Sequence, residues 1–96
     1  MTSEAAYEEL VAHLKRVHSL GSIGELLGWD EQVNLPPESA DQRAEQLAVL
    51  AEVIHAAASD RRIGELLAVL EAAETAASQD QRAVVRQARK DYDRAT

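Results

Sequence analysis

The sequence contains no cysteine and no phenylalanine, and its only aromatic residues are Tyr7, Trp29 and Tyr92. The lack of cysteine excludes disulfide bonds and thiolate chemistry. No hydrophobic run approaches the roughly 18 residues of a membrane span, so the sequence predicts no membrane partner. The N-terminal residues are acidic and amphipathic, unlike a signal peptide. These absences predict a soluble, cytoplasmic protein.

Large apolar side chains are also scarce, because 18 of the 96 residues are alanine. A fully buried large aliphatic side chain stabilises a fold by about 1.5–3 kcal/mol, and alanine contributes much less. A chain of this length buries only roughly 60–65% of its unfolded surface. We therefore expect a thin core that docks onto another chain or onto a missing remainder.

The net charge of −7 is unevenly spread along the chain. Residues 1–79 contain 14 acids and five Lys or Arg residues, whereas residues 80–96 contain five Lys or Arg and three Asp. An acidic body repels phosphate backbones, so no nucleic-acid partner is expected. The basic stretch could bind nucleic acid or acidic lipid. It is more typical of a solvated helix face with internal pairs such as Arg89 with Asp93.

The hydrophobic periodicity predicts an all-α fold of about four helices, at roughly 4–32, 39–58, 60–73 and 79–96, which form an incomplete helical bundle. No strand pattern is present. The predicted apolar face of the first helix consists of Tyr7, Leu10, Val11, Leu14 and Val17 and continues through Leu20, Ile23, Leu27 and Trp29.

Three glycines, Gly21, Gly24 and Gly28, interrupt the second half of the first helix. Each costs about 1 kcal/mol relative to alanine in a helix interior. Their spacing predicts either a bend, which would make them a possible hinge, or a close contact with another helix.

Capping signals separate the later helices. Pro36 and Pro37 predict a loop, and the phrase from Ser39 to Gln42 predicts a capping box. Asp60 is a candidate cap for the third helix, and Ser78 with Gln81 predicts a second capping box. The predicted buried stripes are Leu47, Leu50, Ala51 and Ile54; then Ile63, Leu66, Leu67 and Leu70; and then Val84, Val85, Ala88 and Tyr92. The last helix reaches Thr96 without a stop signal, which favours a truncated chain.

No set of residues in the sequence predicts catalysis or metal binding. Glu52 and His55 lie one helical turn apart, but the pattern occurs once, whereas di-iron bundles use it twice. His13 and His18 do not share a helix face, although His13 can pair with Glu9. The sequence contains no HExxH, no glycine-rich phosphate loop and no G-x-S-x-G. We therefore expect no catalytic residue, no metal ligand and no bound cofactor in this chain.

Trp29, followed by Asp30, stands just before the double-proline loop. A lone tryptophan in such a place either anchors packing or contacts a ligand. We favour the packing role.

The run Leu26-Leu27-Gly28-Trp29-Asp30, followed by Pro36-Pro37, resembles the N-terminal signature of the Taq-type M32 family of zinc metallocarboxypeptidases. The phrase Arg43-Ala44-Glu45-Gln46-Leu47 is similar to a phrase of that family as well. Two small departures are Leu35, where the family usually has Met, and Glu38-Ser39, where a Gly pair is common. The signature residues, which we expect to be structural, are Trp29, Asp30, Pro36, Pro37, Arg43, Glu45 and Gln46.

The resemblance implies a homodimeric, all-helical enzyme that removes C-terminal residues from peptides. It also implies a zinc ion held by an HExxH helix and a later glutamate, none of which this chain contains. The N-terminal helices of that family cover one side of the substrate groove, so residues 1–96 are expected to be such a cover, with the missing catalytic portion as partner.

Two hypotheses remain from the sequence. The first is a fragment of an M32-like carboxypeptidase that functions only with its catalytic portion. The second is a free-standing helical interaction module without enzymatic activity. A reading frame that continues past Thr96 into HExxH favours the first.

Overall fold

The computed structural model describes residues 1–34 and 40–96. Every regular element in these residues is helical, which confirms the predicted all-α class. The elements are α1 (Ser3–Asn34), α2 (Ala40–Ala58), α3 (Arg61–Ala72), the short 3-10 helix η2 (Glu74–Ala76) and α4 (Gln79–Ala95). These bounds agree with the predicted helices to within two residues.

Side chains at the helix N-termini explain several of these bounds. Asp60 caps α3 by accepting a hydrogen bond from the Arg62 backbone N–H at 2.9 Å. Ser78 and Gln81 form the predicted capping box of α4. Thr2 caps α1, because its Oγ1 accepts a hydrogen bond from the Ala5 N–H at 3.1 Å. Ser39, the predicted cap of α2, lies outside the described residues.

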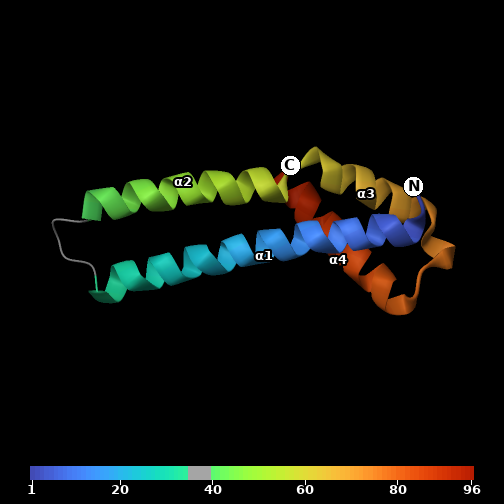
Figure 1. The fold of residues 1–96 in the computed structure, drawn as a ribbon, viewed down its shortest axis with the longest axis horizontal. Coiled ribbons are helices and arrows are strands. Elements are labelled where there is room, and N and C mark those ends of the chain that lie inside the picture. Colours follow the sequence, from blue (N-terminus) through green and yellow to red (C-terminus); the bar gives the residue numbers. More distant parts are fainter. Residues whose placement is uncertain (35–39) are drawn as a thin grey trace.

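The helices form an elongated hairpin that is thickened at one end. Helices α1 and α2 run antiparallel, α3 lies along the N-terminal part of α1, and α4 crosses behind α1 in the view of Figure 1. The radius of gyration is 16.9 Å, well above the roughly 12–13 Å of a compact domain of this length. The predicted incomplete bundle is therefore confirmed.

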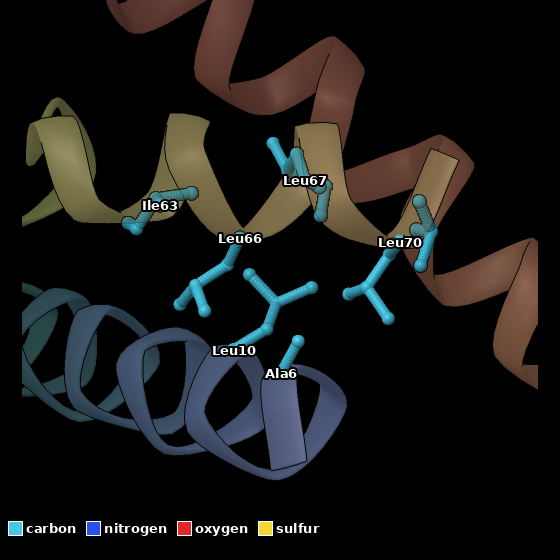
Figure 2. Packing of buried hydrophobic residues seen from close by; sticks show 8 residues of the cluster. Ala6, Leu10, Ile63, Leu66, Leu67 and Leu70 are labelled. Carbon is cyan, nitrogen blue, oxygen red and sulfur yellow. The ribbon is translucent and has the colours of Figure 1, made fainter. Parts of the chain in front are cut away.

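The core lies at the end that holds the N-terminus. Leu10 of α1 and Leu66 and Leu67 of α3 are fully buried (Figure 2). The complete core consists of Ala6, Leu10, Ile63, Leu66, Leu67, Leu70, Val85 and Ala88. The predicted stripe of α3 is confirmed in full. In α4, Val85 and Ala88 are buried, while Val84 and Tyr92 are only partly covered.

Helix α2 contributes no residue to this core. Its predicted buried stripe is wrong in degree, because Leu47, Leu50 and Ile54 are only half-buried and Ala51 is exposed. Among the described residues, the far part of the hairpin is two helices thick. A single partner helix covers only one side of an apolar stripe.

Two ion pairs connect the helices around the core. The Arg62 guanidinium of α3 donates two hydrogen bonds to the Glu9 carboxylate of α1, with Nη2 2.9 Å from Oε1. Arg89 of α4 donates to both carboxylate oxygens of Glu71 in α3, at 2.7 and 3.0 Å. The predicted pair of Arg89 with Asp93 is also present, at 3.4 Å. Each of the three helices around the core is thereby held to a neighbour by a bidentate contact.

These hydrogen bonds change the acidity of both carboxyl groups. The Arg62 hydrogen bond holds the pKa of Glu9 below its usual value, and the Arg89 hydrogen bond does the same for the pKa of Glu71. The same Glu71 contact raises the pKa of Arg89. The carboxylate forms are thus favoured in the folded chain.

The Glu71–Arg89 pair predicts an acid-dependent loss of stability. The folded pKa of Glu71 lies below its ordinary 4.5, so the pair stabilises the fold above about pH 4.5, and this contribution is lost as the pH falls through the folded pKa. Glu71→Gln should lower the free energy of unfolding at pH 7 by at most about 1 kcal/mol, because the pair is partly solvated. The difference should vanish in acid. Urea unfolding across pH tests this, with Glu74→Gln as the control that removes an equal charge from η2. A deficit that persists unchanged in acid contradicts it.

Gly64 provides a second test of the packing. A Cβ atom at Gly64 would lie 2.7 Å from the Tyr92 hydroxyl oxygen and 2.9 Å from Cζ, whereas nothing lies within 4 Å of a Cβ at Gly21. Gly21→Ala should therefore raise stability by up to about 1 kcal/mol through helix propensity. Gly64→Ala should lower the Tm, since it displaces the Tyr92 ring. Thermal unfolding followed by circular dichroism compares the two, and equal stabilisation by both would disprove the contact.

Candidate functional surface

The residues singled out by the sequence gather at the end of the hairpin that lacks the core. Trp29 lies near the C-terminal end of α1, and Arg43, Glu45 and Gln46 lie in the first turns of α2. Arg43 is half-buried, and the other two are exposed. Pro36 and Pro37, like the side chain of Asp30, lie outside the described residues. The antiparallel course of α1 and α2 brings the described members to one end of the molecule (Figure 1).

Trp29 does not have the packing role predicted for it among the described residues. Its surface is 61% exposed, and Ile23 and Leu26 on the same helix are 48% and 69% exposed. The predicted burial of Ile23 and Trp29 is therefore wrong within this chain. The periodicity identifies apolar positions correctly, but α3 and α4, which would have to cover them, pack only on the N-terminal part of α1.

Of the two roles predicted for the glycines, a bend or a close contact with another helix, Gly24 supports the second. A Cβ atom at this position would be 3.5 Å from Ile54 Cδ1 and 3.7 Å from Leu50 Cδ2, so the α1–α2 contact is close here. Gly21 and Gly28 have no such neighbour. Helix α1 continues through all three glycines. The predicted close contact thus exists at one of the three positions, and the hinge stays a prediction.

The Gly24 contact also fixes which side chains share a side of the hairpin. Each residue of an α-helix is rotated by about 100° from the one before. Because the helices are antiparallel, the residues just before the contact positions point to the same side of the pair. These are Ile23 before Gly24, Val49 before Leu50, and Val53 before Ile54. All three are exposed, at 48%, 55% and 43%.

We call Ile23, Val49 and Val53 the apolar face. It lies on the side of α1 away from α4. Ile23 is nine residues from Leu14, which is about two and a half helical turns, so the two side chains point in opposite directions. Leu14 packs against the core and lines a small cavity together with Val84 and Ala88 of α4. The opposite side of the hairpin therefore presents aliphatic side chains to solvent.

Sequence reasoning missed Val49 and Val53, although a signal for them exists. They are four residues apart and adjoin the Leu50–Ile54 stripe, so α2 is apolar over more of its circumference than one partner helix can cover. A helix that is apolar on two adjoining faces indicates a second partner.

The histidines and their acidic neighbours do not form a metal centre. His13 Nε2 lies 3.8 Å from Glu9 Oε2, as their spacing predicts. His55 and Glu52 are both exposed. No group of three or more His, Cys, Asp or Glu side chains that could hold a metal ion occurs among the side chains that the structure describes, those of residues 1–29 and 41–96. No helix of the described chain is long and apolar enough to cross a membrane.

The chain is similar to known proteins over most of its length. The family model of the carboxypeptidase Taq (M32) metallopeptidases matches residues 9–96. The chain is similar to thermostable carboxypeptidase 1 of Thermus thermophilus, with 39% identity over 71 residues. The match covers 74% of this chain and 14% of that enzyme, so the chain spans about one seventh of its relative's length. The chain belongs to the carboxypeptidase Taq (M32) metallopeptidase family.

Proposed function

We propose that residues 1–96 are the N-terminal segment of a zinc-dependent carboxypeptidase that releases C-terminal amino acids from peptides. One observation carries this proposal: the family model matches residues 9–96, while the chain spans only 14% of the related carboxypeptidase. In this proposal the segment covers the substrate groove and is inactive without the catalytic portion.

The arrangement of the described His, Asp and Glu side chains supports the proposal that the catalytic portion provides the zinc site. A catalytic zinc ion in proteins takes three converging His, Cys or carboxylate ligands and a water molecule. The described residues do not fit such a site, because they bring no three donors together. Zinc and the groups that activate water are therefore assigned to the rest of the enzyme, and no step of peptide hydrolysis is assigned to this chain.

The apolar face supplies the contact with the catalytic portion. Ile23, Val49 and Val53 are each roughly half exposed, so burial of the remaining surface contributes about half of the roughly 1.5–3 kcal/mol that a fully exposed side chain of this size would. Charged residues are depleted at the centres of protein interfaces, which suits this aliphatic strip on an acidic chain. Trp29, at the same end of α1, would then find its packing partner outside the 96 residues.

A chimera with the Thermus thermophilus relative tests the proposed function. The segment of that enzyme that matches this chain is replaced by the corresponding residues of this chain, and release of C-terminal amino acids is measured with and without a zinc chelator. We expect chelator-sensitive activity from the chimera and none from the isolated chain, because the described residues of the latter bring no three zinc donors together.

Matched variants of the chimera test the docking surface. Ile23→Asp places a charge in the apolar face and should lower activity and the Tm. Ala48→Asp, an equally exposed position of α2 outside that face, should change neither. An inactive chimera with a native Tm favours the free-standing interaction module. Zinc-dependent activity of the isolated chain contradicts both hypotheses.

The two open glycines allow a test of the hinge. No described atom lies within 4 Å of a Cβ atom at Gly21 or Gly28, so alanine fits at both positions without a clash with the described residues. If the cover bends here during turnover, Gly21→Ala with Gly28→Ala should reduce kcat in the chimera while it raises the Tm, because alanine stiffens the helix. Unchanged kcat contradicts the hinge.

A further inference from the structure

Helix α4 carries a row of cationic side chains that the proposed function does not use. Arg82, Arg86, Lys90 and Arg94 follow one another at intervals of four residues, and all four are exposed. Positions four apart lie on nearly the same side of a helix, about 6 Å apart along its axis. We call these four residues the cationic row.

Three other charged residues of α4 have polar partners. Arg89 is paired with Glu71 and Asp93, and Asp91 accepts a hydrogen bond from Gln87 at 3.1 Å. For the cationic row, by contrast, the part of the chain that the structure describes provides no ion pair. Helix α4 therefore carries one cation, Arg89, that is neutralised by Glu71 of α3. It also carries the cationic row, for which the described residues provide no acidic partner.

Three members of the row border a groove. Arg82, Arg86 and Lys90 line a hollow of about 860 Å³ between α4, the N-terminal turn of α1 and the segment that joins α3 to α4. Below the row lie Leu70 and Val85, which are almost completely buried, and the apolar lining that reaches solvent consists of Tyr7, Ala73, Ala76 and Ala77. The groove thus combines an apolar floor with a cationic edge.

We propose that this groove binds an amphipathic helix of a partner protein whose acidic side chains recur every four residues. Such a helix places carboxylates about 6 Å apart, which matches the spacing of the cationic row. Exposed ion pairs are individually weak, so the aliphatic side chains of the partner must also pack on Tyr7 and the alanines of the lining. Docking of an apolar helix face into a groove is a common mode of peptide recognition.

The same lining disfavours nucleic acid. Glu4 and Glu74 stand on the groove beside the cations, and the chain carries a net charge of −7. A phosphate backbone would meet both repulsions along its whole length. Tyr7 is the only aromatic residue of the lining, whereas single-stranded nucleic acids need several stacking surfaces. A helix can instead turn its acidic side toward α4 and a neutral side toward Glu4.

The proposal is independent of carboxypeptidase activity and is tested on the 96-residue chain. The probe is a fluorescein-labelled, helix-forming peptide with glutamates at four-residue spacing beside a row of leucines, and binding is followed by fluorescence anisotropy. We expect saturable binding that weakens as salt is raised, because exposed charges are screened within about 8–10 Å at physiological ionic strength. Absence of binding overturns the proposal.

Two triple variants of equal charge locate the site. Arg82→Gln with Arg86→Gln and Lys90→Gln should raise the Kd about tenfold or more, since it removes three charge pairs together. The control, Lys15→Gln with Arg16→Gln and Arg61→Gln, removes three exposed cations outside the groove and should leave the Kd unchanged. Thermal unfolding verifies that both variants fold, and an equal loss in both variants contradicts a defined site.

Competing occupants are separated in the same titrations. A peptide with lysine in place of every glutamate must not bind. Tighter binding of a single-stranded oligonucleotide of equal charge, lost in the groove variant, would assign the site to nucleic acid instead. Salt-sensitive self-association in sedimentation equilibrium, also lost in that variant, would assign it to a second copy of the chain. Either result overturns the proposed acidic helix.

Discussion

The fold depends on the insertion of the α3 apolar stripe between α1 and α4. Leu66 and Leu67 are fully buried there together with Leu10, and the bidentate pairs Glu9–Arg62 and Glu71–Arg89 border the same contact on its two sides. α3 is only 12 residues long, too short to be stable alone in water, so its helical structure depends on this packing. Because the core lies at one end, the burial of an apolar side chain depends on how far from α3 it lies.

Because the core lies at one end, apolar residues are covered in one region of the chain and exposed in another. Near α3, apolar residues are covered within the chain, and the remaining polar contacts connect helices. Farther along α1 and α2, Ile23, Val49 and Val53 remain exposed because two helices cannot enclose two apolar sides each. In the proposed function, these uncovered side chains form the contact with the catalytic portion of an M32 enzyme, of whose relative this chain spans one seventh.

Local signals in the sequence predicted the helices and the α3 core well. The caps at Asp60 and Ser78, and the stripe from Ile63 to Leu70, act within a few residues and can be recognised without knowledge of tertiary contacts. Burial of Ile23 and Trp29 was predicted wrongly, because periodicity identifies an apolar side of a helix but not the presence of a partner. The cationic row was visible as a basic stretch, but only the fold showed that three of its members border a groove with an apolar floor.

Helix α1 is continuous from Ser3 to Asn34, a length of about 48 Å at 1.5 Å per residue. Its first turns are fixed in the core, while its last turns carry Trp29 at the opposite end of the molecule. As long as α1 stays straight, it works as a lever, so a small rotation where Leu10 meets α3 becomes a larger displacement at the tip. Gly21 and Gly28 lie between the core and Trp29, so a hinge at these positions would absorb the rotation before it reaches the tip.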